Sequence, residues 1–327
     1  MLLTYSERHR SPFFSDTNWN KQVAVLSFLL LSFPVHPQNV KLLELDWSSQ
    51  QVLTHVLHQL FRTQHIESEV VDGPAKGQWF YLSSGKADIQ VEVWEGTMSK
   101  ALETLLSKNR GEVAATHHIV SREGWWYPKF VEEMCPGLPS WRALAECTGV
   151  FVDEYGVDTY YSGPWEKPER ARIRALELPF TVVQLANGEE INRRIVESMN
   201  KKKPVLIFNW SPNWVWQVYE GKFIEFPDYH VDCEANASWG VNTHYAWDCD
   251  NPKKGWLKSV VSSSLKSKSP CAHAITKSFI MKDKDLNYAS YLVDVKKLSI
   301  ASAAEVWLDH NKSRINDWTD HPECNMR

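Results

Sequence analysis

The sequence has little excess charge of either sign and no long apolar run. Its 36 Lys and Arg residues stand against 40 Asp and Glu residues, and this net charge of −4 gives no reason to expect a nucleic acid partner. No stretch reaches the roughly 18 consecutive apolar residues of a membrane-spanning helix. Internal repeats and low-complexity tracts are also missing. With 43% hydrophobic and 23% charged residues, the composition excludes a wholly disordered chain, a collagen-like structure and a coiled-coil rod.

Motifs of metal sites and of acyl transfer are missing as well. None of the six cysteines forms a CxxC pair, so structural zinc and thioredoxin-type chemistry fit badly. The pair His117 and His118 has no HExxH context, and the segment 83–85 (SSG) is not a nucleophile elbow. We therefore expect a protein that is not an enzyme and that needs no metal and no cofactor.

An even number of cysteines at local spacings predicts disulfides. The spacings favour Cys135 with Cys147 and Cys233 with Cys249. Each pair closes a short loop, and each is worth roughly 3 kcal/mol in the chain-entropy estimate. The alternative is six buried, reduced thiols. Disulfides are typical of oxidising compartments, so the first interpretation favours a protein outside the cytosol.

The pattern of residues 1–38 predicts that they form a signal peptide or an N-terminal extension. Basic residues precede the apolar run at 23–33, which prolines end. A run of 11 residues is too short to span a bilayer and has the length of a signal-peptide core. The predicted location is periplasmic, or secreted and extracellular.

From residue 39 onward the apolar pattern predicts an α/β fold. Residues 40–47 form an apolar strand, and the helix that follows repeats apolar side chains at helical spacing. Further strands or apolar pieces and helices alternate along the chain, at 67–71, 79–82, 89–94, 99–108, 180–185, 189–200 and 205–210. Strands that alternate with helices indicate mainly parallel sheets covered on both faces.

The sequence is rich in tryptophan, with 16 Trp, 11 Tyr and 13 Phe. Most of these rings fill a core, and some are available to a ligand. Several occur in short motifs: EVWEG at 92–96, GWWYP at 124–128, PGLPSW at 136–141, GPW at 163–165, NWSPNW at 209–214 and AAEVWL at 303–308. In this order, from about 40 to 320, the motifs resemble the substrate-binding proteins of glycine betaine/choline ABC transporters.

That resemblance implies a two-lobed periplasmic-binding-protein fold of type II, in which the chain crosses between lobes twice. We expect residues 39–116 plus 242–327 in one lobe and residues 117–241 in the other. The expected ligand is a methylated ammonium compound, namely glycine betaine, choline or trimethylamine N-oxide. The expected partner is a membrane ABC permease, and the protein itself is expected to be a monomer.

The resemblance also implies an aromatic cage between the lobes. It places Trp94 on one lobe and Trp165 and Trp210 on the other, with Trp125 or Trp126 as a fourth face. A trimethylammonium group offers no N–H or O–H donor, and indole faces attract its charge while they replace water around its methyl groups. Because a quaternary ammonium does not titrate, affinity for choline is expected to be nearly constant between pH 6 and 8.

Glu95 follows the proposed cage residue Trp94 directly. A carboxylate that points into the cage would favour choline or trimethylamine N-oxide over glycine betaine, whose own carboxylate it would repel. A carboxylate that points outward is only a solvated charge.

The alternative function is that of a secreted, Trp-rich carbohydrate-binding protein, in which the rings stack against sugars.

Overall fold

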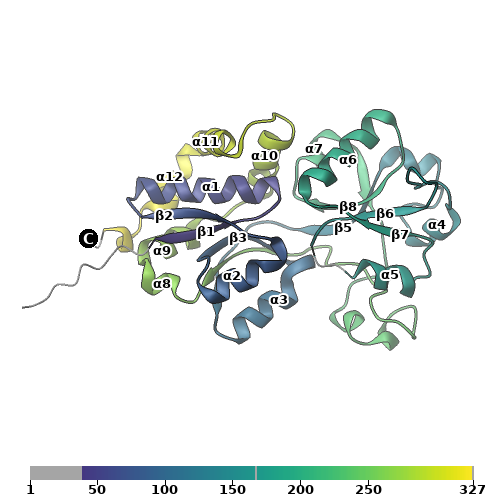
Figure 1. Ribbon diagram of the computed structural model, residues 1–327, viewed down its shortest axis with the longest axis horizontal. Helices are drawn as coiled ribbons and strands as arrows, with labels where there is room; N and C mark the ends of the chain where they lie inside the picture. Colours follow the sequence, from purple (N-terminus) through teal and green to yellow (C-terminus); the bar gives the residue numbers. More distant parts are fainter. Residues whose placement is uncertain (1–38, 166–167, 326–327) are drawn as a thin grey trace, which may run out of the picture. The chain divides into compact units, whose positions relative to one another are not determined.

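The computed structural model describes residues 39–165 and 168–325. The predicted signal peptide at 1–38 lies outside these residues. The described chain forms two separate five-stranded sheets, and helices accompany each sheet (Figure 1). We call each sheet with its helices a lobe. The predicted two-lobed α/β fold is confirmed.

The first lobe contains the strand order β2-β1-β3-β10-β4. β1 pairs in parallel with β2 and β3, and β10 runs antiparallel between β3 and β4. Its strands are β1 (Val40–Glu44), β2 (Ser68–Asp72), β3 (Ile89–Trp94), β4 (Gly111–Thr116) and β10 (Leu257–Ser262). Its helices are α1 (Ser48–Thr63), η1 (Ala75–Gly77), α2 (Gln78–Ser84), α3 (Glu95–Ser107), α8 (Leu265–Lys268), α9 (Pro270–Ser278), α10 (Asp283–Asp294), α11 (Ile300–His310), η5 (Lys312–Arg314), α12 (Ile315–Thr319) and η6 (Pro322–Cys324).

The second lobe contains the strand order β7-β6-β8-β5-β9. β6 pairs in parallel with β7 and β8, and β5 runs antiparallel to β8 and β9. Its strands are β5 (Arg122–Pro128), β6 (Thr159–Ser162), β7 (Thr181–Gln184), β8 (Leu206–Ser211) and β9 (Gly221–Phe223). Its helices are η2 (Lys129–Glu133), α4 (Trp141–Glu146), α5 (Glu169–Ala175), α6 (Gly188–Lys201) and α7 (Val215–Val218). The 3-10 turns η3 (Val231–Glu234) and η4 (Ala237–Trp239) follow.

The sheets are mixed, so the expectation of mainly parallel sheets is wrong. In each sheet two strand pairs are parallel and two are antiparallel. The antiparallel pairs all involve β10 or β5, the strands that the chain enters from the other lobe. Such a strand has no crossover helix before it in its own sheet, so nothing forces it to run parallel to its neighbours.

Helix α1 forms as its apolar spacing predicts. Its apolar stripe is buried, and the helix contacts β1, β2 and β3 as well as α10 and α11. The apolar piece at 79–82 is not a strand but part of α2, which Gly85 ends in the left-handed conformation with φ 73°. Glycine is the residue that adopts this conformation at no steric cost.

The chain passes between the two sheets twice, through residues 117–121 and residues 224–256. These two crossings touch at Ser121 and Gly255, where the backbone N–H of each residue donates to the carbonyl of the other at 2.7 and 2.8 Å. The crossings therefore lie side by side at this point.

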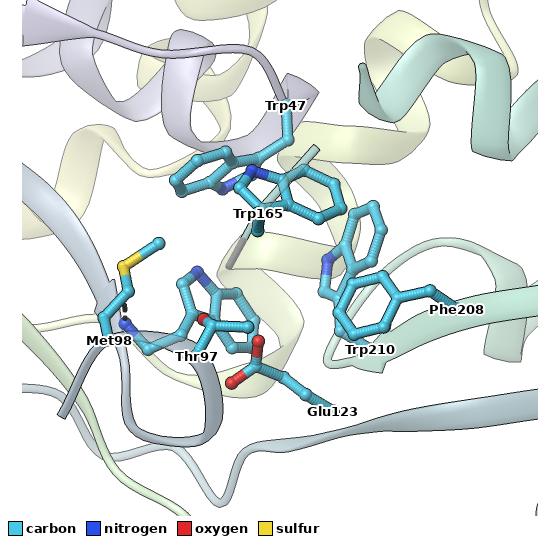
Figure 2. Close-up of a pocket in the computed structure, with 8 residues that line it drawn as sticks. Trp47, Thr97, Met98, Glu123, Trp165, Phe208 and Trp210 are labelled. Carbon is cyan, nitrogen blue, oxygen red and sulfur yellow. Dashed lines mark hydrogen bonds between the residues drawn. The ribbon is translucent and has the colours of Figure 1, made fainter. Parts of the chain in front are cut away.

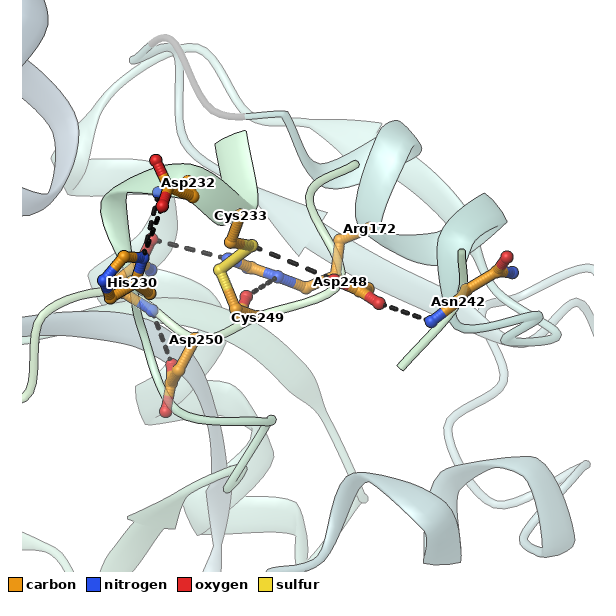
Figure 3. Close-up of a disulfide and its surroundings, with 9 residues drawn as sticks. Arg172, His230, Asp232, Cys233, Asn242, Asp248, Cys249 and Asp250 are labelled. Carbon is orange, nitrogen blue, oxygen red and sulfur yellow. Dashed lines mark hydrogen bonds and ion pairs between the residues drawn. A yellow bond between two sulfur atoms is a disulfide. The ribbon is translucent and has the colours of Figure 1, made fainter. Parts of the chain in front are cut away.

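Three disulfides hold the described chain, and all six cysteines take part. Two are the predicted pairs Cys135–Cys147 and Cys233–Cys249. The third, Cys271–Cys324, joins α9 to η6 across 53 residues of sequence. Figure 3 shows that Cys233–Cys249 lies beside the buried Arg172 of α5, whose Nε donates to the carbonyl of Cys249 at 3.1 Å. The second crossing, residues 224–256, which we call the return crossing, is thus bound to α5 of the second lobe at Cys249.

Candidate functional site

A cavity lies between the two lobes, with side chains from both in its wall (Figure 2). The cavity volume is about 20 Å³. That is far below the roughly 300 to 1,000 Å³ typical of pockets for drug-sized ligands, so the side chains leave only a narrow space between them in this structure. The lining residues are Trp47, Trp94, Thr97, Met98, Glu123, Trp165, Phe208 and Trp210.

Two indoles occupy the same place in two strand–helix units of the first lobe. Trp47 is the N-cap of α1, which follows β1, and Trp94 is the N-cap of α3, which follows β3. Both have extended backbone, with φ −135° and −95°. Because β1 and β3 are parallel neighbours, both indoles come to the carboxyl edge of the sheet, where ligands of open α/β sheets bind.

The second lobe supplies its aromatic wall from β8 and from the loop after β6. Phe208 and Trp210 are two residues apart on β8, so their side chains share one face of the strand. Trp165 follows β6 and contacts both, with ring centroids 5.3 Å from Phe208 and 5.5 Å from Trp210.

Trp165 also reaches the first lobe. Its ring lies edge-on to Trp47 with centroids 5.9 Å apart, and its Nε1 donates to Asp46 Oδ1 at 3.2 Å. Burial raises the pKa of Asp46 above its ordinary value, while the bond from Trp165 lowers it. The backbone N–H of Gly188 donates to the carbonyl of Asp46 at 3.2 Å. Four tryptophans from two lobes therefore surround one space.

Glu123 brings a carboxyl group to the same wall. It lies opposite Trp210 in the antiparallel register of β5 and β8. The carboxyl group packs against the first turn of α3, where a Cβ added to Gly96 would lie 2.6 Å from Glu123 Oε2. The positive end of the helix dipole favours a negative charge in this position. In Figure 2 this carboxyl group points from the strand towards the aromatic rings.

This arrangement has counterparts among known proteins. The family model of the substrate-binding domain of ABC-type glycine betaine transport systems matches residues 38–310. The chain belongs to this family. The trimethylamine N-oxide-binding protein of Pelagibacter ubique (strain HTCC1062) is 28% identical over 282 residues, which are 82% of this chain and 86% of that protein.

Solved structures of glycine betaine and choline binding proteins share the fold. A choline-binding protein of an ABC transporter, in complex with choline, has a TM-score of 0.68 at 13% identity, over 86% of this chain and 91% of that one. A glycine betaine and L-proline binding protein from Borrelia burgdorferi has a TM-score of 0.68 at 17% identity, over 88% and 99%. The family membership favours the methylammonium interpretation over the carbohydrate-binding alternative.

Membership of the glycine betaine family also bears on location and partners. Its members are extracytoplasmic solute-binding proteins, which bind small ligands and work with a membrane permease. Among the described residues, no helix combines the length and the apolar character that crossing a membrane requires.

The structure brings three of the predicted cage residues to the cavity and leaves three others away from it. Trp94, Trp165 and Trp210 line it. Glu95 does not, because its carboxylate accepts a hydrogen bond from the backbone of Trp256 at 3.0 Å. Trp94 is the N-cap of α3, and Glu95 is the first residue of this helix. The side chain of Glu95 therefore points towards the return crossing, which contains Trp256.

Trp125 and Trp126 are fully buried and do not line the cavity. The Trp125 ring stacks on Tyr160 with centroids 3.9 Å apart, and its Nε1 donates to Glu169. The fourth tryptophan at the cavity is instead Trp47, the last residue of the apolar segment 40–47.

Phe208 and Glu123 were also missed. Glu123 directly precedes the GWWYP motif, and the register that sets it opposite Trp210 depends on pairing between strands far apart in sequence. The sequence predicts a carboxyl group beside the cage at Glu95. In the structure the carboxyl group at the cavity wall is that of Glu123, from the second lobe.

Proposed function

We propose that this protein captures a small methylated ammonium compound, and trimethylamine N-oxide in the first place, for an ABC permease. The observation that carries the proposal is a single cavity lined by four indoles and one carboxyl group, from Glu123. In this proposal Trp94, Trp165 and Trp210 form the cage, with Trp47 in the place expected for Trp125 or Trp126. Glu95 takes no part.

The indoles account for affinity. A desolvated cation over an indole face gains up to about 2 kcal/mol, and several faces together supply a large share of the roughly 8 kcal/mol of micromolar binding. The edge-on packing of Trp165 against Trp47 and Trp210 turns the rings to different sides of the space. A rounded trimethylammonium head fits such walls better than a flat sugar does.

Glu123 accounts for the choice among ligands. Glycine betaine would place its own carboxylate in a small cavity that already holds one, and the two charges would repel. The oxygen of trimethylamine N-oxide is more basic than the carboxylate of glycine betaine, so it takes up more readily the one proton that a hydrogen bond to an ionised Glu123 needs. The Trp210 Nε1, which is buried and has no hydrogen-bond partner among the described residues, is a donor for the same oxygen.

The narrow space between the rings favours the most compact of the three ligands. Trimethylamine N-oxide has no chain beyond its oxygen, whereas choline and glycine betaine extend further from the nitrogen. The relative from Pelagibacter ubique, a trimethylamine N-oxide-binding protein by name, supports this order. Choline remains the second ligand in our proposal, since its positive charge is compatible with Glu123.

We propose that the protein acts as a monomer in the periplasm or outside the cell, without catalysis. The first lobe boundary is proposed at 117, as predicted. For the second, contacts favour a place after 241, because Asn242 Nδ2 donates to the carbonyl of Ala175 at 2.7 Å and Arg172 to Asn251 at 3.4 Å. We therefore propose that the chain returns to the first lobe at about 252.

Calorimetry with trimethylamine N-oxide, choline, glycine betaine and a cello-oligosaccharide tests the function. We expect trimethylamine N-oxide to bind tightest, glycine betaine at least tenfold more weakly, and the sugar not at all. Glu123→Gln removes the charge and keeps the shape, so it should reduce the preference over glycine betaine by about tenfold. Sugar binding, or an equal preference in both proteins, would contradict the proposal.

A further inference from the structure

Glu92 is a buried carboxyl group directly behind the cavity wall. It lies on β3, its side chain is 0% exposed, and it does not line the cavity. Its Oε2 accepts a hydrogen bond from Trp47 Nε1 at 2.7 Å and another from Ser49 Oγ at 3.1 Å. Trp94 lies two residues along the same strand, so its side chain leaves β3 on the same face.

Burial also affects the ionisation of this carboxyl group. It raises the pKa of Glu92 to about 7, and hydrogen bonding by Trp47 and Ser49 opposes that rise. Its Oε1 has no hydrogen-bond partner within the described ranges. The group is thus incompletely satisfied, although it holds the Trp47 indole and lies on the same face of β3 as Trp94.

A purely structural role does not require an acid here. An indole N–H is satisfied by any acceptor, such as the oxygen of Gln, and Gln90 already occupies this face of β3. An ionised carboxyl group in a buried place is costly, because it loses its hydration. The energetic cost is offset when a cation binds a few ångströms away in a cavity of low dielectric constant.

We propose that Glu92 is a positioning residue that also supplies negative charge to the cage: it fixes Trp47 through its indole N–H group and attracts the bound ammonium through the ring. This inference rests on the proposed function. Hydrogen bonding of the N–H to an anion also enriches the ring in electron density, which strengthens its attraction for a cation.

A pH dependence follows from this role. A cation binds the ionised form of Glu92 better than the neutral form, so binding lowers the pKa of Glu92 and releases protons near neutral pH. A shift of the pKa from about 7 to roughly 6 would make affinity rise roughly fivefold between pH 6 and 8. This revises the sequence-based expectation of constant affinity, which considered the charge of the ligand alone.

The groups that face Glu92 offer few other sources for a change of affinity with pH. Trp47 and Ser49 come from the start of α1, and Gln90 and Trp94 from β3, and none of these titrates near neutral pH. Other carboxyl groups near these residues are Glu123 on the cavity wall, Asp46 beside Trp165, and Asp294, which accepts from Ser48 Oγ and whose pKa burial raises to about 6. Asp294→Asn serves as the matched control, since it removes a buried carboxyl group that does not line the cavity and leaves Glu92.

The experiment is titration calorimetry with tetramethylammonium chloride, whose charge is independent of pH, at pH 6, 7 and 8 and at constant ionic strength. At pH 7 the titration is repeated in buffers of different ionisation enthalpy, which reports proton release directly. We expect about 0.4 proton released by the parent protein and by Asp294→Asn, and none by Glu92→Gln. The affinity of Glu92→Gln should be constant with pH and below that of the parent at pH 8.

The outcomes separate the two proposals. A parent protein that binds tetramethylammonium with constant affinity and no proton release overturns the role of Glu92 and leaves the proposed function standing. Release that persists in Glu92→Gln also overturns it. Failure to bind any methylammonium compound at any pH refutes the proposed function itself. Since the parent protein alone gives the first result, the test does not depend on the folding of a variant.

Discussion

At the scale of single residues, Trp210 is the cage indole whose removal should disturb the fold least. Its backbone is fixed independently of the ring, because its carbonyl accepts from Trp216 Nε1 at 2.8 Å and its N–H donates to Asn209 Oδ1 at 2.9 Å. Both bonds persist in Trp210→Ala. The ring itself contacts the other aromatic side chains of the cavity.

We expect Trp210→Ala to weaken methylammonium binding at least tenfold while the protein stays folded. Loss of one desolvated cation–π face costs about 1 to 2 kcal/mol. Calorimetry and thermal unfolding measure the two effects separately. Trp141→Ala is the control: this half-buried ring on α4 lies against Arg142 and away from the cavity, so it should lower Tm and leave affinity unchanged. Unchanged choline affinity in folded Trp210→Ala would remove Trp210 from the cage.

Sequence reasoning reached part of the candidate site, and the residues show why. Trp94, Trp165 and Trp210 stand in short motifs that resemble a known family, and each comes to the cavity. Trp47 has a helix-capping place like that of Trp94, but no motif distinguishes it from core residues. Glu123 reaches the cavity through strand register, which no local pattern reveals.

At the scale of elements, the first crossing begins with a buried histidine that ties strands of the first lobe together. His117 Nε2 lies 3.0 Å from the carbonyl of Val91, and its Nδ1 accepts from the backbone N–H of Met281 at 3.2 Å. Both bonds suit the neutral ring, in which one nitrogen donates and the other accepts. Burial lowers the pKa of His117 to about 4.

We expect this histidine to make the protein sensitive to acid. Its pKa is near 6.5 when unfolded and lower when folded, so the unfolded state binds more protons as pH falls below 6.5. The free energy of unfolding should drop by about 2 kcal/mol between pH 7 and 5 from this group alone. Denaturant unfolding of His117→Asn at both pH values should show most of this drop removed.

His118→Asn is the matched control, because its side chain is exposed and next in sequence. It should retain the full pH dependence of the parent protein. The same drop in His117→Asn and the parent would assign the acid sensitivity to other groups, such as the buried carboxyls.

Elements were easier to predict than their arrangement. The strands at 40–47 and 205–210 and the helix at 189–200 follow from local apolar patterns, and the structure has β1, β8 and α6 there. The segment 79–82 was ambiguous because four apolar residues fit either period. The antiparallel placement of β10 and β5 depends on where the crossings deliver them, which is a property of the whole chain.

At the scale of the whole molecule, the disulfide Cys271–Cys324 fixes the C-terminal part of the chain to the first lobe. It joins α9 to η6, and α9 also contacts α12. Local spacing suggested the other two pairs, but a separation of 53 residues is informative only once the fold brings the helices together. The local spacing of Cys271 and Cys324 therefore predicts no pairing between them.

Replacement of Cys271 and Cys324 by Ser should lower the free energy of unfolding by about 4 kcal/mol, because the closed loop is long. Denaturant unfolding measures the change. Affinity for the ligand should be unaffected, since neither element lines the cavity. A loss below about 1 kcal/mol would mean that the packing of α9 and α12 alone holds the terminus.

The paired backbone of Ser121 and Gly255 has a mechanical consequence. Because two hydrogen bonds join the crossings, a shear or twist of the lobes about one crossing alone would strain both bonds. The motion that keeps these bonds is a rotation of one lobe against the other about an axis through the pair. A ligand that contacts the side chains of both lobes in the cavity would fix the angle of this rotation. We therefore expect the loaded and the empty protein to differ mainly in that angle, which the proposed permease would recognise on the outer surfaces of both lobes.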